Sequence, residues 1–265
     1  MQTFAEYILN EKNLGSKMEI VYYLAKKERI FFDKTVILKT EILRMFTNNI
    51  NTDLDVNELL TAILLASCKK VEVSTDPEKI KAFSKEGAEY LYSIGFDKRF
   101  CKICEGINRY TVQEKREKES DILELVDQFG GMIIDRRERI GMKPDEALVL
   151  LEHRNLKDKY NRYLHLFIEF IKKIEEIKIK ENNDKTPLEI LMKLYKESID
   201  EKHFITAVIY EYEAKVDEAI CKSQCGEFFN IRKNTKELEK GNPNRPLFSE
   251  ETTKKIIGEL MDRDK

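Results

Sequence analysis

The sequence predicts an all-α protein, and three observations lead to this fold class. Apolar residues recur every three or four positions through most of the 265-residue chain. Two such stripes are Tyr160, Tyr163, Leu164, Phe167, Ile171 and Ile174, and then Ile205, Val208, Ile209, Tyr212, Val216 and Ala219. Only ten glycines and five prolines interrupt the pattern. The chain also lacks the Asn-Gly and Asp-Gly pairs that close two-residue β-hairpins.

Helix starts can be assigned in the N-terminal half of the chain. Ser16 precedes Glu19 by three positions, which is the spacing of a capping box, ahead of a helical pattern over residues 18–30. Pro144 marks a second start, and the two acidic residues after it would lie at the positive end of that helix.

Two further starts are predicted in the C-terminal half. Thr186 is followed by Pro187 and Glu189, which suits an N-cap, a first-turn proline and a reciprocal cap. Ser249 stands before two glutamates and opens the last predicted helix.

Polar stretches divide the chain, at residues 74–79, 180–187 and 240–249. The second has no large apolar residue and is the best boundary. We therefore expect an N-terminal helical segment over residues 1–29, a main domain over 30–180 and a helical C-terminal extension over 181–265.

Composition narrows the class of protein. Forty-seven basic residues nearly balance 49 acidic ones, so no overall field would attract nucleic acid or an acidic membrane. No apolar run is long enough to span a bilayer, and the first residues do not resemble a secretory signal. Five cysteines, an odd number, do not suggest a disulfide framework. A cytoplasmic location is expected.

One segment is similar to a known family. Residues 122–148 match, without a gap, a pattern I-L-x-V-A-D-x-F-D-A-L-x-x-D-R-P-Y-R followed by an E-E-A-L helix. The matching positions include Asp127, Phe129, Asp135, Arg136, Arg139 and the stretch Asp145–Leu148. Over about residues 30–175 the chain resembles the HD superfamily, and within it the HD-GYP cyclic-dinucleotide phosphodiesterases.

Weaker matches lie upstream in the family's order. Residues 62–70 stand where the family has a helix ending in L-L-H-D-I-G-K, residues 84–96 where it has H-P-x-x-G-A, and residues 106–110 where it has H-H-E-R. No GYP motif follows. The resemblance implies an HD-like helical bundle of bacterial signalling type.

The metal ligands of that family are missing. Its His-Asp pair is Ala66-Ser67 here, and its later histidines correspond to Ser84, Gly106 and Ile107. No histidine precedes position 153, and none of these replacements can act as a neutral nitrogen ligand. We therefore expect no catalytic residue, no metal and no cofactor, and an inactive member of the family.

Four residues are candidates for a ligand site. Lys70 and Arg109 stand at the family's lysine and arginine positions, and Asp127 at its final metal ligand. With Arg136, they could line an anion pocket where the metals once lay. The ligand would be a nucleotide or a cyclic dinucleotide.

Simpler structural roles compete with this interpretation. Asp127 could be a helix acid paired with a nearby lysine or arginine. Asp135, Arg136 and Arg139 could bind phosphate, or they could brace the turn after a helix end.

The cysteines and histidines favour structural roles. Cys101 and Cys104, and later Cys221 and Cys225, have ligand-like spacing, but about 116 residues separate the pairs. They fit core positions better than a zinc site. His165 lies beside an apolar stripe, as a core or boundary residue would.

Three functions remain open. The first is a regulatory or scaffolding protein that acts through protein contacts, with a possible homodimer. It predicts that Leu65, Cys68 and Ile107 fill the old active-site cavity and that an apolar patch lies on the surface elsewhere. The second is a sensor, which needs basic side chains converging on the old active site. The third is a metal phosphohydrolase with displaced ligands.

Overall fold

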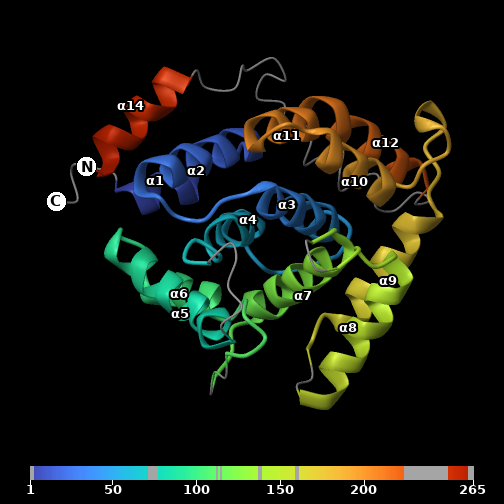
Figure 1. The fold of residues 1–265 in the computed structure, drawn as a ribbon, viewed down its shortest axis with the longest axis horizontal. Helices are drawn as coiled ribbons and strands as arrows, with labels where there is room; N and C mark the ends of the chain where they lie inside the picture. Colours follow the sequence, from blue (N-terminus) through green and yellow to red (C-terminus); the bar gives the residue numbers. More distant parts are fainter. Residues whose placement is uncertain are drawn as a thin grey trace.

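The computed structural model describes residues 3–70, 77–111, 113, 115–136, 139–158, 161–223 and 250–261. Within these residues the chain is helical, with isolated backbone bridges and no strand (Figure 1). The all-α prediction is confirmed. No described helix is both long and apolar enough to cross a membrane.

The described helices follow one another along the chain. In order they are α1 (Phe4–Asn10), α2 (Leu14–Glu28), α3 (Lys34–Thr47), α4 (Val56–Leu65), α5 (Pro77–Ser93), α6 (Lys98–Glu105), α7 (Lys118–Ile133), α8 (Pro144–Asp158), α9 (Leu164–Glu176), α10 (Pro187–Glu197), α11 (Glu201–Ala207), α12 (Glu213–Ser223) and α14 (Glu250–Met261). A 3₁₀ turn, η1 (Lys180–Asn182), precedes α10, and a π turn, η2 (Val208–Tyr212), joins α11 to α12.

The predicted helix starts can be compared with the observed caps. Thr186 caps α10 as predicted, accepting from the Glu189 backbone N–H at 3.2 Å while that glutamate accepts from the Thr186 N–H at 2.8 Å. Pro144 opens α8. The prediction at Ser16 is wrong, because Asn13 caps α2 three residues earlier and accepts from the Ser16 N–H. Ser249 lies outside the described residues.

Two of the predicted breaks can be checked in part. Residues 77–79 belong to α5, so the first break ends earlier than expected, and residues 74–76 lie outside the described residues. The second break is a tight loop, in which Asn183 and Asp184 adopt left-handed backbone angles. A bridge from Ile179 to Lys185 closes this loop. Residues 240–249 are outside the described residues.

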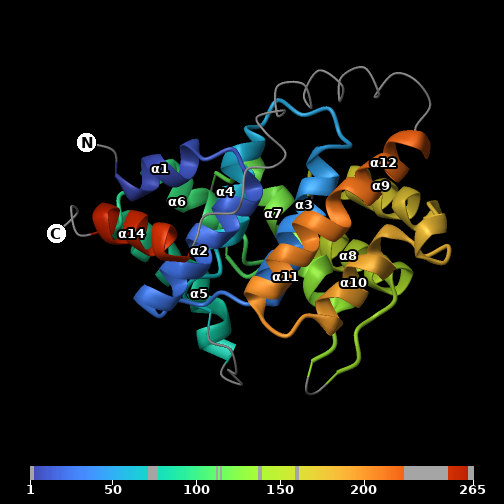
Figure 2. The same cartoon turned by 90° about the horizontal axis from the view of Figure 1, so that it is seen from above.

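Helix α3 lies at the centre of the molecule (Figures 1 and 2). It is buried from Val36 to Thr47, and it packs against α4 and α7 on one side and α10 and α11 on the other. Helices α11 and α14 also pack against α2. The three predicted segments therefore share one hydrophobic core, which extends from Phe4 to Met261.

A buried ion network ties α3 to the C-terminal helices. Arg44 donates to Glu41 on the same helix at 2.6–3.0 Å and to Asp217 of α12 at 3.0 and 3.1 Å. Glu41 is fully buried and Arg44 nearly so. Since an isolated charge at this depth would be costly, the pairing fixes where α12 lies along α3.

The π turn explains the packing of α11 and α12. Their buried row repeats every four residues: Phe204, Val208, Tyr212, Val216 and Ile220. On an ideal α-helix, residues four positions apart point in directions that differ by about 40°, so such a row drifts round the helix. The wider π turn takes up part of this drift, and the Tyr212 hydroxyl donates to the Pro187 carbonyl at 2.9 Å.

Candidate functional site

Asp127 forms a buried ion pair. It lies on α7, facing α3, and accepts from the Lys39 ammonium at 2.7 Å. The Lys39 side chain is 5% exposed and that of Asp127 is 23% exposed. Gly130 lets the lysine cross α7, because a Cβ at that position would come within 2.7 Å of the Lys39 Cγ. The simpler interpretation of Asp127, a pairing with a nearby cation, is therefore confirmed.

Lys70 lies close to this pair. It follows α4, is half-buried, and its ammonium stands 5.5 Å from the centre of the Phe31 ring. Repulsion from Lys39, followed by burial and by Arg136, lowers the pKa of Lys70 to about 8, although Asp127 and Asp33 act in the other direction. Within the described part of the chain it makes no ion pair.

Arg136 completes the group. It follows α7, is exposed, and its backbone bridges to Arg139. Its guanidinium turns back over α7, where a Cβ at Gly131 would lie 3.1 Å from the Arg136 Nη2. Gly131 is one helical turn beyond Asp127, on the same face.

Together these residues form what we call the basic cluster: Lys39, Lys70 and Arg136 around Asp127. Burial alone would raise the pKa of Asp127, but the three cations outweigh it and lower that pKa. Three cations face one paired carboxylate, with Asp33 nearby, so the cluster carries an excess of positive charge that favours an anion. Two of its cations are accessible to solvent: Lys70 is half-buried and Arg136 is exposed.

Arg109 is not part of the basic cluster. Its guanidinium stacks 4.8 Å from the centre of the Tyr110 ring. It also lies near Arg154, whose pKa is lowered by burial and then by Arg109. None of the contacts described for Arg109 reaches Asp127 or Lys70. The structure therefore brings together three of the four predicted residues and adds Lys39.

Asp135 and Arg139 brace the turn after α7. Asp135 accepts from the Gly141 backbone N–H at 2.8 Å. Arg139 donates to the carbonyls of Gly131 and Met132 at 2.8 Å each. The structural alternative thus holds for these two side chains, and the Arg136 guanidinium also lies against α7, beside Gly131.

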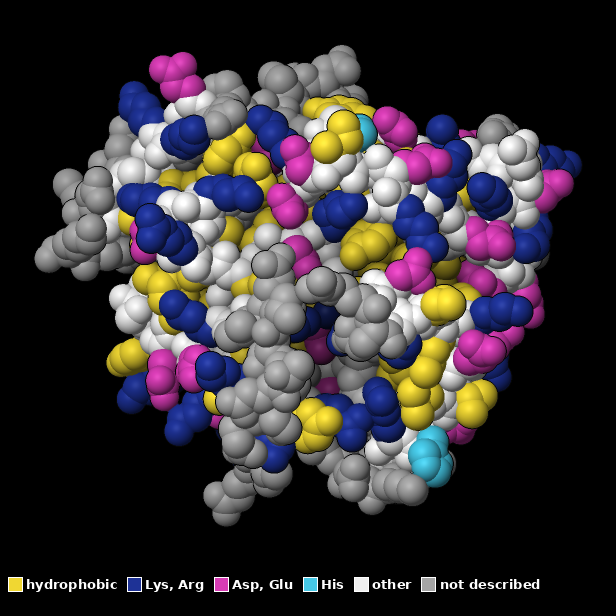
Figure 3. Space-filling view, in the orientation of Figure 1, with side chains coloured by type: hydrophobic (Ala, Val, Ile, Leu, Met, Phe, Trp, Pro, Cys, Tyr) yellow, Lys and Arg dark blue, Asp and Glu magenta, His cyan; other side chains and the backbone are white. Residues whose placement is uncertain are grey.

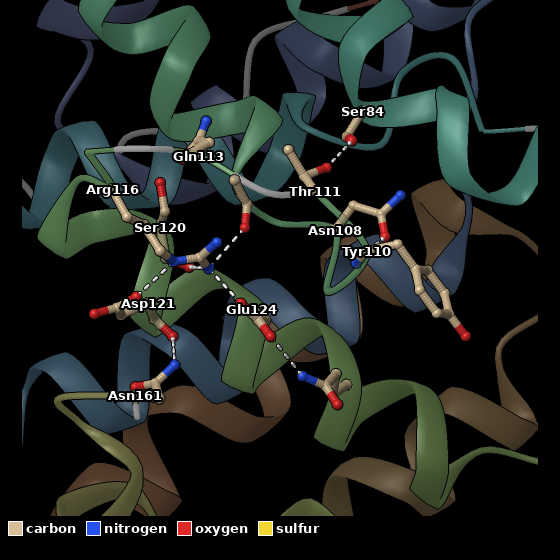
Figure 4. A network of polar contacts seen from close by, with 12 residues as sticks. Ser84, Asn108, Tyr110, Thr111, Gln113, Arg116, Ser120, Asp121, Glu124 and Asn161 are labelled. Atoms are coloured by element: carbon tan, nitrogen blue, oxygen red, sulfur yellow. Dashed lines mark hydrogen bonds and ion pairs between the residues drawn. The ribbon is translucent and has the colours of Figure 1, made fainter. Parts of the chain in front are cut away.

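The positions that correspond to the family's later histidines lie in a packed polar network (Figure 4). Ser84 is fully buried, with its hydroxyl 3.1 Å from that of Thr111. Asn108 donates to the Lys81 carbonyl at 2.9 Å and accepts from the Tyr110 backbone N–H at 3.0 Å.

Arg116 is the centre of this network. Its guanidinium donates to Asp121 at 2.6 Å, to the carbonyls of Gly106 and Ser120 at 2.8 and 2.9 Å, and to Glu124. These contacts hold the segment before α7 against the end of α6 (Figure 4). The network satisfies charge within the fold, which is a structural role.

No side chain larger than that of glycine fits at position 106. A Cβ at this position would lie 2.4 Å from the Ser120 Oγ. Ile107, Leu65 and Cys68 are also buried, as the scaffold hypothesis predicts.

The cysteines and His165 do not form a site in the described residues. Cys68, Cys101 and Cys104 are buried, and burial raises the pKa of the Cys68 thiol to about 12 and that of Cys101 to about 11. No group of His, Cys, Asp and Glu suited to a metal occurs among the residues described. Cys225 lies outside them.

The expectation for His165 is wrong. Its side chain is 84% exposed and stands 3.1 Å from Glu169, one helical turn away. Lying next to an apolar stripe, it falls on the solvent side of α9.

Comparisons with models of protein families, with curated proteins and with solved structures gave no match to this chain.

Proposed function

We propose that the protein is a non-catalytic regulatory protein of the HD type, which binds a phosphate-bearing small molecule at the basic cluster. The observation that supports this proposal is the excess of cations around Asp127. The ammonium of Lys39 pairs with that carboxylate, so Lys70 and Arg136 are left to meet an anion. A nucleotide or a cyclic dinucleotide carries suitable phosphate oxygens.

The proposal gives each residue a role. Lys39 supplies, next to Asp127, a positive charge of the kind that a metal ion supplies in active members of the resembled family. Lys70 would act as a point charge on one phosphate oxygen, and the Arg136 fork would hold two. A signal would then be read through occupancy of the cluster by the ligand, without bond cleavage.

Thermal unfolding of the purified full chain tests this function. The probes are inorganic pyrophosphate, ATP, GTP, cyclic di-AMP and cyclic di-GMP, each titrated to saturation. We expect at least one of them to raise the Tm saturably, because a ligand that binds only the folded state stabilises it by mass action. Lys70→Ala and Arg136→Ala should abolish the shift while their ligand-free Tm stays close to that of the wild type.

Arg109→Ala is the matched control. It removes an arginine predicted from the same resemblance but placed away from the cluster, so it should keep the full shift. A flat response to every probe, or an equal loss of the shift in all three variants, would refute binding at the basic cluster.

A second candidate is a scaffold that acts through protein contacts alone. The burial of Leu65, Cys68 and Ile107 supports it, because this hypothesis needs these side chains to be packed inside the fold. The scaffold predicts the flat response in the experiment above.

A further inference from the structure

A groove separate from the basic cluster lies between α9 and α12. The two helices run at the same end of the molecule in both views (Figures 1 and 2). The groove has a volume of about 1150 Å³ and also touches η1 and Asn49 after α3. It exceeds the roughly 300–1,000 Å³ of most small-molecule pockets.

The floor of the groove is apolar. It is formed by Phe170 and Ile174 of α9, Ile177 and Ile179 beyond that helix, and Ala219 of α12. Phe170, Ile174 and Ile179 are buried, while Ile177 and Ala219 are half-buried. The apolar surface that the floor offers to an occupant therefore comes mainly from Ile177 and Ala219, which lie over the buried side chains.

The walls are basic. Five lysines line them, Lys173, Lys178, Lys180, Lys215 and Lys222, against Glu176 and Glu218. Lys222 and Glu218 pair with each other at 2.6 Å. The other four lysines are exposed and form no ion pair with any residue in the part of the chain that the structure describes.

This local charge contrasts with the whole molecule, whose formal net charge is −2. The lysines come from two separate segments, one on each side of the floor. Figure 3 shows basic and acidic side chains mixed over the face that it presents. In the lining of the groove five lysines stand against two glutamates, so the groove carries a local excess of positive charge.

We infer that this groove binds an acidic amphipathic helix of a partner protein. An apolar floor between basic walls is complementary to a helix with an apolar stripe and acidic flanks. A cylinder 10 Å wide that filled the groove would be about 15 Å long, or roughly ten residues of α-helix. Nucleic acid is less suited, since the walls have no arginine and the floor has no exposed aromatic ring on which bases could stack.

Fluorescence anisotropy with the full chain tests the inference. The probe is a labelled 14-residue peptide. Its leucines recur at spacings of three, four and seven residues, so that they form one stripe of a helix, and glutamates fill the other positions. We expect saturable binding that weakens as salt is raised. A scrambled peptide of the same composition should bind at least about tenfold more weakly, because its leucines no longer form one stripe.

Charge reversals locate the site. Lys173→Glu and Lys215→Glu, one in each wall, should each weaken binding about tenfold or more. Lys172→Glu is the matched control, because Lys172 is exposed on the same helix but does not line the groove. It should bind like the wild type.

Three results would overturn the inference. One is no saturable binding, or the same affinity for the scrambled peptide. Another is equal weakening by all three reversals. A third is evidence that something else occupies the groove. Such evidence would be displacement of the peptide by a single-stranded oligonucleotide, or a dimer in analytical ultracentrifugation that Lys173→Glu dissociates.

Discussion

At Lys17, a charged side chain is enclosed inside the fold. It is fully buried on α2, and its ammonium donates to the Ile8 carbonyl at 2.6 Å and to the Thr61 hydroxyl at 2.5 Å. Burial lowers its pKa to about 7, against the opposing effects of Glu11 and Asp55. The same residue thus joins α1, α2 and α4 and makes the stability of the protein depend on pH.

The sign of this dependence follows from proton binding. The folded pKa of about 7 lies below the unfolded value of 10.5, so between these values the unfolded chain binds more protons and stability rises with pH. Lys17 alone should add about 2 kcal/mol to the free energy of unfolding between pH 7 and pH 9.

Urea unfolding of the wild type and of Lys17→Met at pH 7, 8 and 9 measures this contribution. Over that range the free energy of unfolding of the variant should rise by about 2 kcal/mol less than that of the wild type. Subtracting one pH profile from the other cancels the contributions of other titrating groups, such as Lys70. Parallel pH profiles for both proteins would show that Lys17 keeps an ordinary pKa.

At the scale of single residues, the sequence predicts a residue that belongs to a local motif, but not the partner that is distant along the chain. Asp127 stood out by its place in a motif, yet its partner Lys39 lies 88 positions away, and no spacing rule connects them. Lys39 does leave a trace, since it stands in the mostly apolar stretch of residues 36–46. Arg109 was assigned to the same pocket by resemblance alone, and the structure places it beside Tyr110 instead.

Among the elements, α3 and α12 depend on Arg44. Arg44→Met would leave Glu41 and Asp217 buried without their cation, so we expect a loss of about 3–5 kcal/mol in the free energy of unfolding. Lys193→Met is the control, because Lys193 pairs with Glu197 at 3.7 Å on an exposed surface and should cost under about 1 kcal/mol.

Chemical denaturation of both variants gives these values. Equal, small losses would mean that the buried network contributes no more than a surface pair. If Arg44→Met does not fold, Arg44→Lys keeps one positive charge and should lie between that variant and the wild type.

Helix boundaries show what sequence patterns can and cannot predict. Thr186 was predictable because its cap uses residues three positions apart. Ser16 failed because Asn13, an equally good capping residue, begins the helix earlier, and both residues fit the local pattern. The π turn was not foreseen, since its cause is the packing of Tyr212 against distant residues.

For the whole molecule, the shared core predicts cooperative unfolding. The C-terminal helices pack on α2 and α3, and the core includes residues of all three predicted segments. We therefore expect residues 3–223 to unfold in one transition, although the sequence suggested a boundary at residues 180–187.

Two reporters can test this, because the chain has no tryptophan. Tyr92→Trp places one on α5 and Tyr210→Trp places one in η2, at positions 56% and 54% exposed. The urea midpoints of the two fluorescence signals should coincide with each other and with circular dichroism. A lower midpoint at position 210 would contradict a single cooperative unit.

The π turn also has a consequence for how this sequence can vary. The wider π turn holds about one residue more in the same rotation than an α-helical turn. The loss of one residue between Val208 and Tyr212 would therefore let the turn become ordinary α-helix and leave α12 facing nearly the same way. One added residue would instead rotate α12 by about 100°, and move Asp217 away from Arg44 and Lys215 away from the wall opposite α9. At this place the chain should accept the loss of a residue better than the gain of one.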